Sequence, residues 1–143
     1  MRASGFRFFL VLVVIGVLFV VRTLGDLPAS VATNFGGGGA PHAWIGRQAY
    51  AGYLVVIGLV IPLAIVSVMV RRGGVQAGRW WLASLMLGLA LGLHAVLLAA
   101  HRTQPPQLST AGFLTLMGLF VVGLVSWLLR WGRPARSASE MER

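Results

Sequence analysis

Four apolar runs, each close to the length of a membrane span, determine what this chain can fold into. They cover about residues 6–24, 49–70, 80–100 and 111–131, and charged residues stand only near their ends. About 20 apolar residues in a helix cross the hydrocarbon core of a bilayer. The sequence is 57% apolar and only 10% charged, whereas soluble domains are about one quarter charged. We therefore predict an all-α, polytopic membrane protein with one four-helix transmembrane domain over residues 1–143.

The first run is the shortest. Its uninterrupted apolar part, residues 8–21, would rise only about 21 Å as a helix, so it spans a membrane only if Arg7 and Arg22 extend toward the headgroups. The rival interpretation is a signal peptide with a cleavage site near residues 30–32. Arg22 and Asp26 separate the run from that site, which favours a retained span.

The distribution of arginine predicts the orientation of the chain, whose net charge is +9 without any lysine. Nine arginines stand before or at the start of the first run, between the second and third, or at and beyond the end of the fourth, and three lie on the opposite side: Arg22, Arg47 and Arg102. The positive-inside rule then places both termini and the tail 132–143 in the cytoplasm, and the Gly/Pro-rich loop 25–48 outside. We expect a bacterial plasma membrane protein whose arginines contact anionic lipid, with no nucleic-acid partner.

The external loop contains the most distinctive motif. A Leu-Pro pair follows the first run, and aromatic, Gly and Pro residues then follow at fixed spacing: Leu27, Pro28, Phe35, Gly39, Pro41 and Trp44. The pattern resembles the signature of a bacterial integral membrane domain of unknown function that also occurs in SdpI-like immunity proteins. Where that family has His and Asp, this chain has Asn34 and His42.

The resemblance implies a binding role for the external loop. A characterised member of the family protects its cell against a secreted, membrane-active peptide toxin and also recruits a repressor to the membrane. A binding surface for a peptide toxin or a partner membrane protein is accordingly expected at Pro28, Asn34, Phe35, Pro41, His42 and Trp44. The alternative is that the proline and the aromatic residues only fold the loop onto the headgroups, where Trp is favoured. Four consecutive glycines make the loop mobile unless a partner or the neighbouring spans hold it.

Small residues in the third run predict a helix-packing face. Ser84, Gly88 and Gly92 recur every four residues, and small residues let membrane helices approach closely. Gly118 and Gly123 make the fourth run a plausible neighbour. The partner of this face is either another span of the same chain or a second copy in a homo-oligomer.

One histidine, an ionisable residue, lies inside an apolar run. His94 lies in the outer half of the third run, where such a residue is a candidate polar site, for instance a proton relay. The alternative is a neutral His94 that is hydrogen-bonded inside the bundle, with His101 at the membrane interface. His42, His94 and His101 together would offer three metal ligands, but their spacing and the lack of a nearby carboxylate argue against a metal. No cofactor is indicated.

The residue inventory argues against an enzyme. Asp26 is the single carboxylate before the tail, and there is no cysteine, so paired-carboxylate and thiol chemistry are excluded. The leading hypothesis is a non-enzymatic membrane protein that binds a peptide or protein through its external loop. One alternative is a small transporter or channel subunit, in which Pro62 kinks the second run and frees a carbonyl, with a path along Gly58, Pro62, Ser67, Ser84 and His94. The other is a structural or assembly subunit of a membrane complex.

Overall fold

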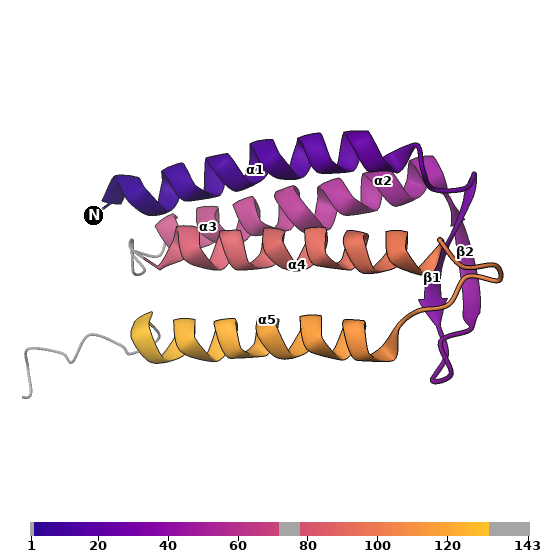
Figure 1. Ribbon diagram of the computed structural model, residues 1–143. Coiled ribbons are helices and arrows are strands. Elements are labelled where there is room, and N and C mark those ends of the chain that lie inside the picture. Colours follow the sequence, from indigo (N-terminus) through magenta and orange to yellow (C-terminus); the bar gives the residue numbers. More distant parts are fainter. Residues whose placement is uncertain (1, 72–77, 132–143) are drawn as a thin grey trace, which may run out of the picture.

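Four helical segments are long and apolar enough to cross a membrane, which confirms the predicted all-α, polytopic fold. The computed structural model describes residues 2–71 and 78–131 (Figure 1); the predicted tail 132–143 lies outside them. The helical elements are α1 (Arg2–Leu24), α2 (Arg47–Val55), the π-helical turn η1 (Val56–Val60), α3 (Ile61–Arg71), α4 (Arg79–Ala100) and α5 (Thr110–Trp131). The elements α2, η1 and α3 follow one another directly and form one span.

The two ends of the helical bundle differ in chemistry. At one end, the hairpin end, two short strands lie across the helices (Figure 1). At the opposite end, the helices begin or finish near a set of arginines, and we call it the arginine-rich end: Arg7, Arg71, Arg79 and Arg130. Asp26, the single acidic residue in the described part of the chain, directly follows α1 at the hairpin end.

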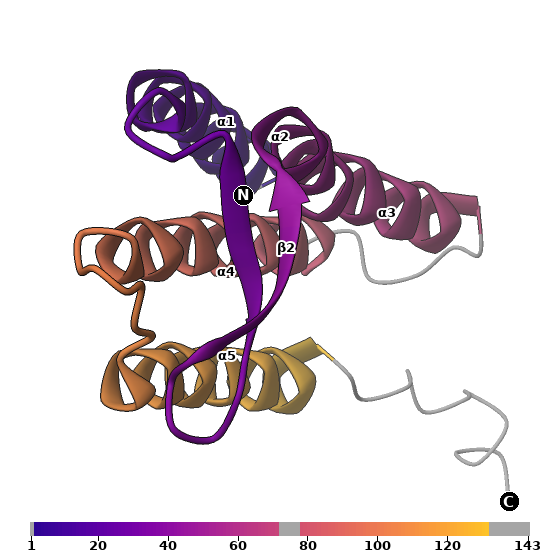
Figure 2. The ribbon, with the colours of Figure 1, turned by 90° about the vertical axis from the view of Figure 1, so that its right-hand side faces the viewer.

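Helix α4 is the centre of the bundle. In the view along the helices, α1 and the α2–α3 span lie on one side of α4, and α5 lies on the other (Figure 2). The helices α1, α3 and α5 each pack against α4. No residue of α5 is buried, whereas α4 buries seven. The bundle is therefore open around α5, which relies mainly on α4 for its packing.

Glycines allow these helices to approach closely. A Cβ atom added to Gly16 of α1 would lie 2.8 Å from the Leu91 side chain of α4. A Cβ atom added to Gly123 of α5 would lie 2.7 Å from Leu85 of α4. In each pair a leucine of α4 fills the space that the missing side chain leaves, which is how membrane helices gain packing contacts without a hydrophobic driving force.

The kink predicted at Pro62 takes the form of a π-helical turn. Proline cannot donate a backbone hydrogen bond, so the helix before it must adjust. The adjustment is η1, in which Ile61 N–H donates to Val56 O, five residues back. The widened turn lets the span continue to Arg71, and Gly58 within it packs against α4.

The external segment differs from the prediction, which took it as a loop without regular structure. It contains an antiparallel hairpin of β1 (Ser30–Phe35) and β2 (Pro41–Gly46), with irregular register between Ala32 and Phe35. The four glycines supply the turn, where Gly39 has φ +78°, a conformation that residues with a Cβ rarely adopt. The prediction gave weight to the glycines and overlooked the β-branched and aromatic residues on both sides, which favour strands.

Candidate functional site

The hairpin is fastened to the bundle through strand β1. The side chains of Val31 and Ala32 are completely buried. The Ala32 N–H donates to Nε2 of His101, which follows α4, at 3.0 Å. His101 Nδ1 lies 2.8 Å from the Leu97 carbonyl, which can only accept. The ring therefore carries its hydrogen on Nδ1 and is held as the neutral tautomer, with both nitrogens occupied.

Two further contacts hold the base and the tip of the hairpin. At the base, Arg47 donates from Nη1 to the Leu27 carbonyl at 2.9 Å and from its backbone N–H to Ala29 O, also at 2.9 Å. At the tip, Leu108 in the α4–α5 connection donates its N–H to Gly39 O at 3.1 Å. The connection between the third and fourth spans thus holds the glycine turn. The mobility predicted for an unheld turn therefore does not apply.

Strand β2 forms the outer side of the hairpin. His42, Ala43 and Trp44 are all exposed, and Trp44 is 47% exposed to solvent. Its ring meets that of His101 edge to face at a centroid distance of 6.3 Å. Within residues 2–71 and 78–131, the backbone of these three residues makes no hydrogen bond outside the β1–β2 ladder. The outer edge of β2 is therefore an unpaired strand edge.

The hairpin brings together five of the six residues predicted to bind a partner. Strand pairing sets Phe35 opposite Pro41, with Asn34 and His42 beside them at the tip and Trp44 nearer the base. Pro28 lies apart from them, before β1. The exposed members are Pro28, Asn34, His42 and Trp44, whereas Phe35 and Pro41 are partly buried.

Phe35 faces the interior rather than the outside. Its side chain lines a cavity of about 220 Å³ beneath the hairpin, together with Tyr50, Tyr53, Leu108 and Phe113 among others. This position makes Phe35 an anchor of the hairpin on the bundle. The surface open to a partner is thus provided chiefly by β2, from His42 to Trp44.

His94 sits at the centre of a polar network that joins three spans. It is completely buried, with Nε2 2.8 Å from the Thr23 hydroxyl of α1 and Nδ1 3.0 Å from the Tyr50 hydroxyl of α2. The Thr23 hydroxyl donates its own hydrogen to the Phe19 carbonyl at 2.7 Å. Thr23 must then accept from His94 Nε2–H, and Tyr50 must donate to Nδ1.

This arrangement matches the alternative prediction for His94, a neutral ring hydrogen-bonded inside the bundle. A neutral ring needs one donor and one acceptor, and Tyr50 and Thr23 supply them. Neither partner was predicted from the sequence. Comparing the positions of polar residues along the predicted spans would have found them. The end of α1, the start of α2 and the end of α4 lie toward the same end of the bundle.

The structure does not bring the three histidines together. His42 lies at the hairpin tip, His94 inside the bundle and His101 under β1, each with separate neighbours. In the described ranges, no group of three His, Asp or Glu side chains is placed to hold a metal ion.

The residues predicted to line a transport path are also dispersed. Ser67 is exposed, and its hydroxyl donates to Leu63 O, whereas Pro62 and His94 are buried. Of the predicted set, Ser84 alone lines a cavity of about 770 Å³ between α1, α4 and α5, and none lines the cavity under the hairpin.

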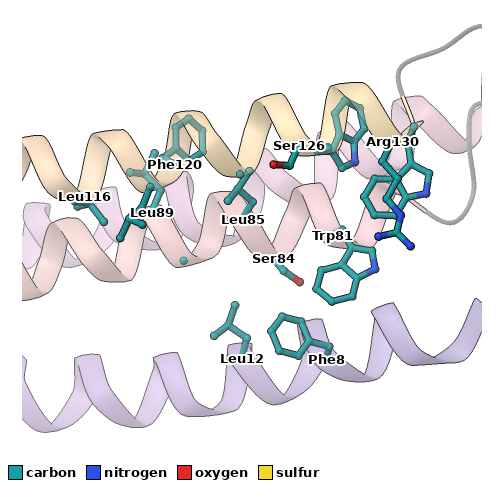
Figure 3. Close-up of a pocket in the computed structure, with 15 residues that line it drawn as sticks. Phe8, Leu12, Trp81, Ser84, Leu85, Leu89, Leu116, Phe120, Ser126 and Arg130 are labelled. Atoms are coloured by element: carbon teal, nitrogen blue, oxygen red, sulfur yellow. The ribbon is translucent and has the colours of Figure 1, made fainter.

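The predicted packing face on α4 is divided. Gly92 contacts Leu116 of α5 so closely that a Cβ atom would collide with it. A Cβ atom on Gly88 would meet nothing within 4 Å, because Gly88 and Ser84 border a cavity of about 770 Å³ between α1, α4 and α5 (Figure 3). Of the two candidate neighbours in α5, Gly123 contacts Leu85, and Gly118 is open. The fourth run is thus a partner of this face within the same chain.

Comparisons of the chain with models of known protein families, with curated proteins and with solved structures find no match.

Proposed function

We propose that this chain is a non-enzymatic protein of the bacterial plasma membrane that binds a peptide, or an extended segment of a partner protein, at the outer edge of β2. The observation that carries the proposal is the hairpin itself: Val31 and Ala32 of β1 are buried and the hairpin is held at its base, at Ala32 and at its tip, whereas β2 has an unpaired edge and exposed side chains. A strand held rigidly at a free edge can accept a further strand through backbone hydrogen bonds.

The chemistry of β2 suits this kind of recognition. Backbone groups of the edge would supply affinity, and the exposed His42 and Trp44 would select the peptide. Trp provides a large, rigid contact area with one hydrogen-bond donor. Pro41 at the start of the strand and the irregular register limit the length of edge that a second copy of the hairpin would find.

The orientation of the chain belongs to the same proposal. The arginine-rich end faces the cytoplasm, with both termini, because nine of the twelve arginines stand on that side of the predicted spans. The hairpin then faces outward, where a secreted peptide arrives. The resemblance of the hairpin motif to SdpI-like immunity proteins supports a peptide toxin as the bound molecule.

The test begins with a gentle-detergent purification of the full chain from its own membrane. Mass spectrometry identifies any stoichiometric peptide or protein, and a synthetic form of it is titrated onto the purified chain. Trp44→Ala is expected to weaken binding at least tenfold. Trp81→Ala is the matched control, because Trp81 is 45% exposed and lies near the start of α4, at the opposite end of the bundle. Equal effects of both substitutions, or a chain that carries only lipid, would contradict the proposal.

A structural or assembly subunit is the second candidate, and α5 favours it. The helix has no buried residue and packs mainly against α4, so much of its surface is available to another membrane protein. Stoichiometric co-purification of a membrane protein that survives Trp44→Ala and is lost on substitution of exposed α5 residues would select this candidate.

A further inference from the structure

The cavity of about 770 Å³ between α1, α4 and α5 lies toward the arginine-rich end of the bundle. We propose that this cavity holds one anionic phospholipid, with an acyl chain over Gly88 and the phosphate beside Arg130. In Figure 3, Phe8 and Leu12 of α1 lie on one side of α4, which forms the floor of the cavity, and Phe120 of α5 lies on the other.

The interior of the cavity requires an apolar occupant. Most of its lining side chains are aliphatic or aromatic. The two serines among them have already used their hydrogens, since Ser84 donates to Trp80 O at 2.8 Å and Ser126 to Val122 O at 2.7 Å. Neither hydroxyl therefore has a hydrogen left to donate to a ligand, and a hydrocarbon chain suits the apolar lining.

The length and closure of the cavity suit an acyl chain. Its lining on α5 runs from Leu116 to Trp131, about 22 Å along a helix, which is more than the roughly 15 Å depth of one hydrocarbon leaflet. At the deep end, the contact of Leu116 with Gly92 closes the space. At the other end, Trp131 and the exposed Arg130 form the mouth.

The charge at the mouth selects an anionic headgroup. The Arg130 guanidinium lies 5.1 Å from the Trp131 ring centroid, a stacking contact that leaves the N–H groups at its edge available. Within residues 2–71 and 78–131, the single acidic residue is Asp26, at the hairpin end. Arginine binds phosphate well because its planar fork matches the phosphate oxygens.

The same charge argues against a second copy of the chain as the occupant. Copies inserted in the same orientation would bring their arginine-rich ends together, including Arg79 and Arg130 of each. Like charges at short distance oppose such an interface. A lipid phosphate instead neutralises the charge, and its acyl chain covers the apolar floor.

Native mass spectrometry of the full chain in detergent tests the proposal. Dioleoyl phosphatidylglycerol and dioleoyl phosphatidylcholine are offered at equal concentration, so that the acyl chains are identical and only the headgroups differ. One retained phosphatidylglycerol per chain is expected. Arg130→Gln should weaken its retention about fivefold, the effect of one arginine near an anionic surface, and Arg102→Gln at the hairpin end should not.

A second experiment fills the floor of the cavity at Gly88 of α4. Gly88→Leu places a side chain in the cavity and should abolish retention. Gly118→Leu is the matched control, because a Cβ atom there also meets nothing within 4 Å but the residue does not line the cavity. Equal binding of both lipids, or equal retention by the two leucine variants, would overturn the proposal. So would a dimer that Gly88→Leu disrupts, because the occupant would then be a second copy.

Discussion

Replacing Thr23 by Val tests whether the His94 network holds the first span in the bundle. Valine has nearly the shape of threonine but offers no acceptor, so His94 Nε2–H loses its partner on α1. Tyr50→Phe makes the equivalent change on α2 by removing the donor to Nδ1. The two substitutions therefore detach the same imidazole from two different helices.

The size of the effect follows from the burial of the ring. Hydrogen bonds between membrane helices contribute about 0.6 kcal/mol on average and up to about 1.7 kcal/mol. His94 is completely buried, so neither water nor a lipid headgroup replaces a lost partner. We expect each substitution to lower the free energy of unfolding by about 1 to 1.5 kcal/mol, in the upper part of that range.

The double variant Thr23→Val/Tyr50→Phe tests whether the two hydrogen bonds of His94 depend on each other. The two bonds meet on one ring, and hydrogen bonds in a chain strengthen one another. Removing the first should weaken the second, so the double variant should lose about 0.5 kcal/mol less than the sum of the single losses, within the range for residues of one network.

Reversible unfolding by SDS in mixed micelles, followed by tryptophan fluorescence, measures these differences. Tyr53→Phe and Thr115→Val are matched controls at exposed positions on the second and fourth spans, and both should stay within about 0.3 kcal/mol of the unsubstituted chain. The reasoning is refuted if Thr23→Val and Tyr50→Phe match these controls, or if their effects add without coupling.

Two further predictions concern the attachment of the hairpin. His101→Phe leaves the Ala32 N–H buried without an acceptor and should cost about 1 to 3 kcal/mol, with faster hydrogen exchange of that amide, whereas His101→Gln keeps an acceptor and should retain most of the stability. Gly39→Ala forces a Cβ atom into a left-handed turn and within 2.7 Å of the Leu108 carbonyl. It should lower the free energy of unfolding by about 1 to 3 kcal/mol. Gly37→Ala, which has open space around its Cβ position, should leave that free energy unchanged.

The helices could be predicted from sequence because their signal is local. Each run is apolar over its length with charges near the ends, and in a bilayer only a helix satisfies every backbone group within the segment. The second run illustrates the limit of such reasoning. Pro62 indicates a defect, but the widened turn at Val56–Val60 depends on how η1 packs against α4, which composition does not contain.

The hairpin could not be located by the same means. Strand-forming residues beside glycines are also compatible with a loop. The contacts that hold the strands in place come from residues distant in sequence: His101 accepts from the Ala32 N–H, and Leu108 donates to Gly39 O. The candidate site shares this origin. His94 was identifiable as an isolated histidine in an apolar run, whereas Thr23 and Tyr50 acquire their roles only when α1 and α2 pack around it.

The absence of acidic residues from the described helices explains where recognition can occur in this fold. Without a carboxylate beside it, a buried histidine has no counter-ion and must stay neutral, so it needs one donor and one acceptor. Tyr50 and Thr23 meet that need completely and leave His94 no free nitrogen for a ligand. Both nitrogens of the imidazole are thereby committed to joining α4 to α1 and α2. The groups still open to other molecules lie at the two ends, where the edge of β2 offers backbone hydrogen bonds and Arg130 offers charge.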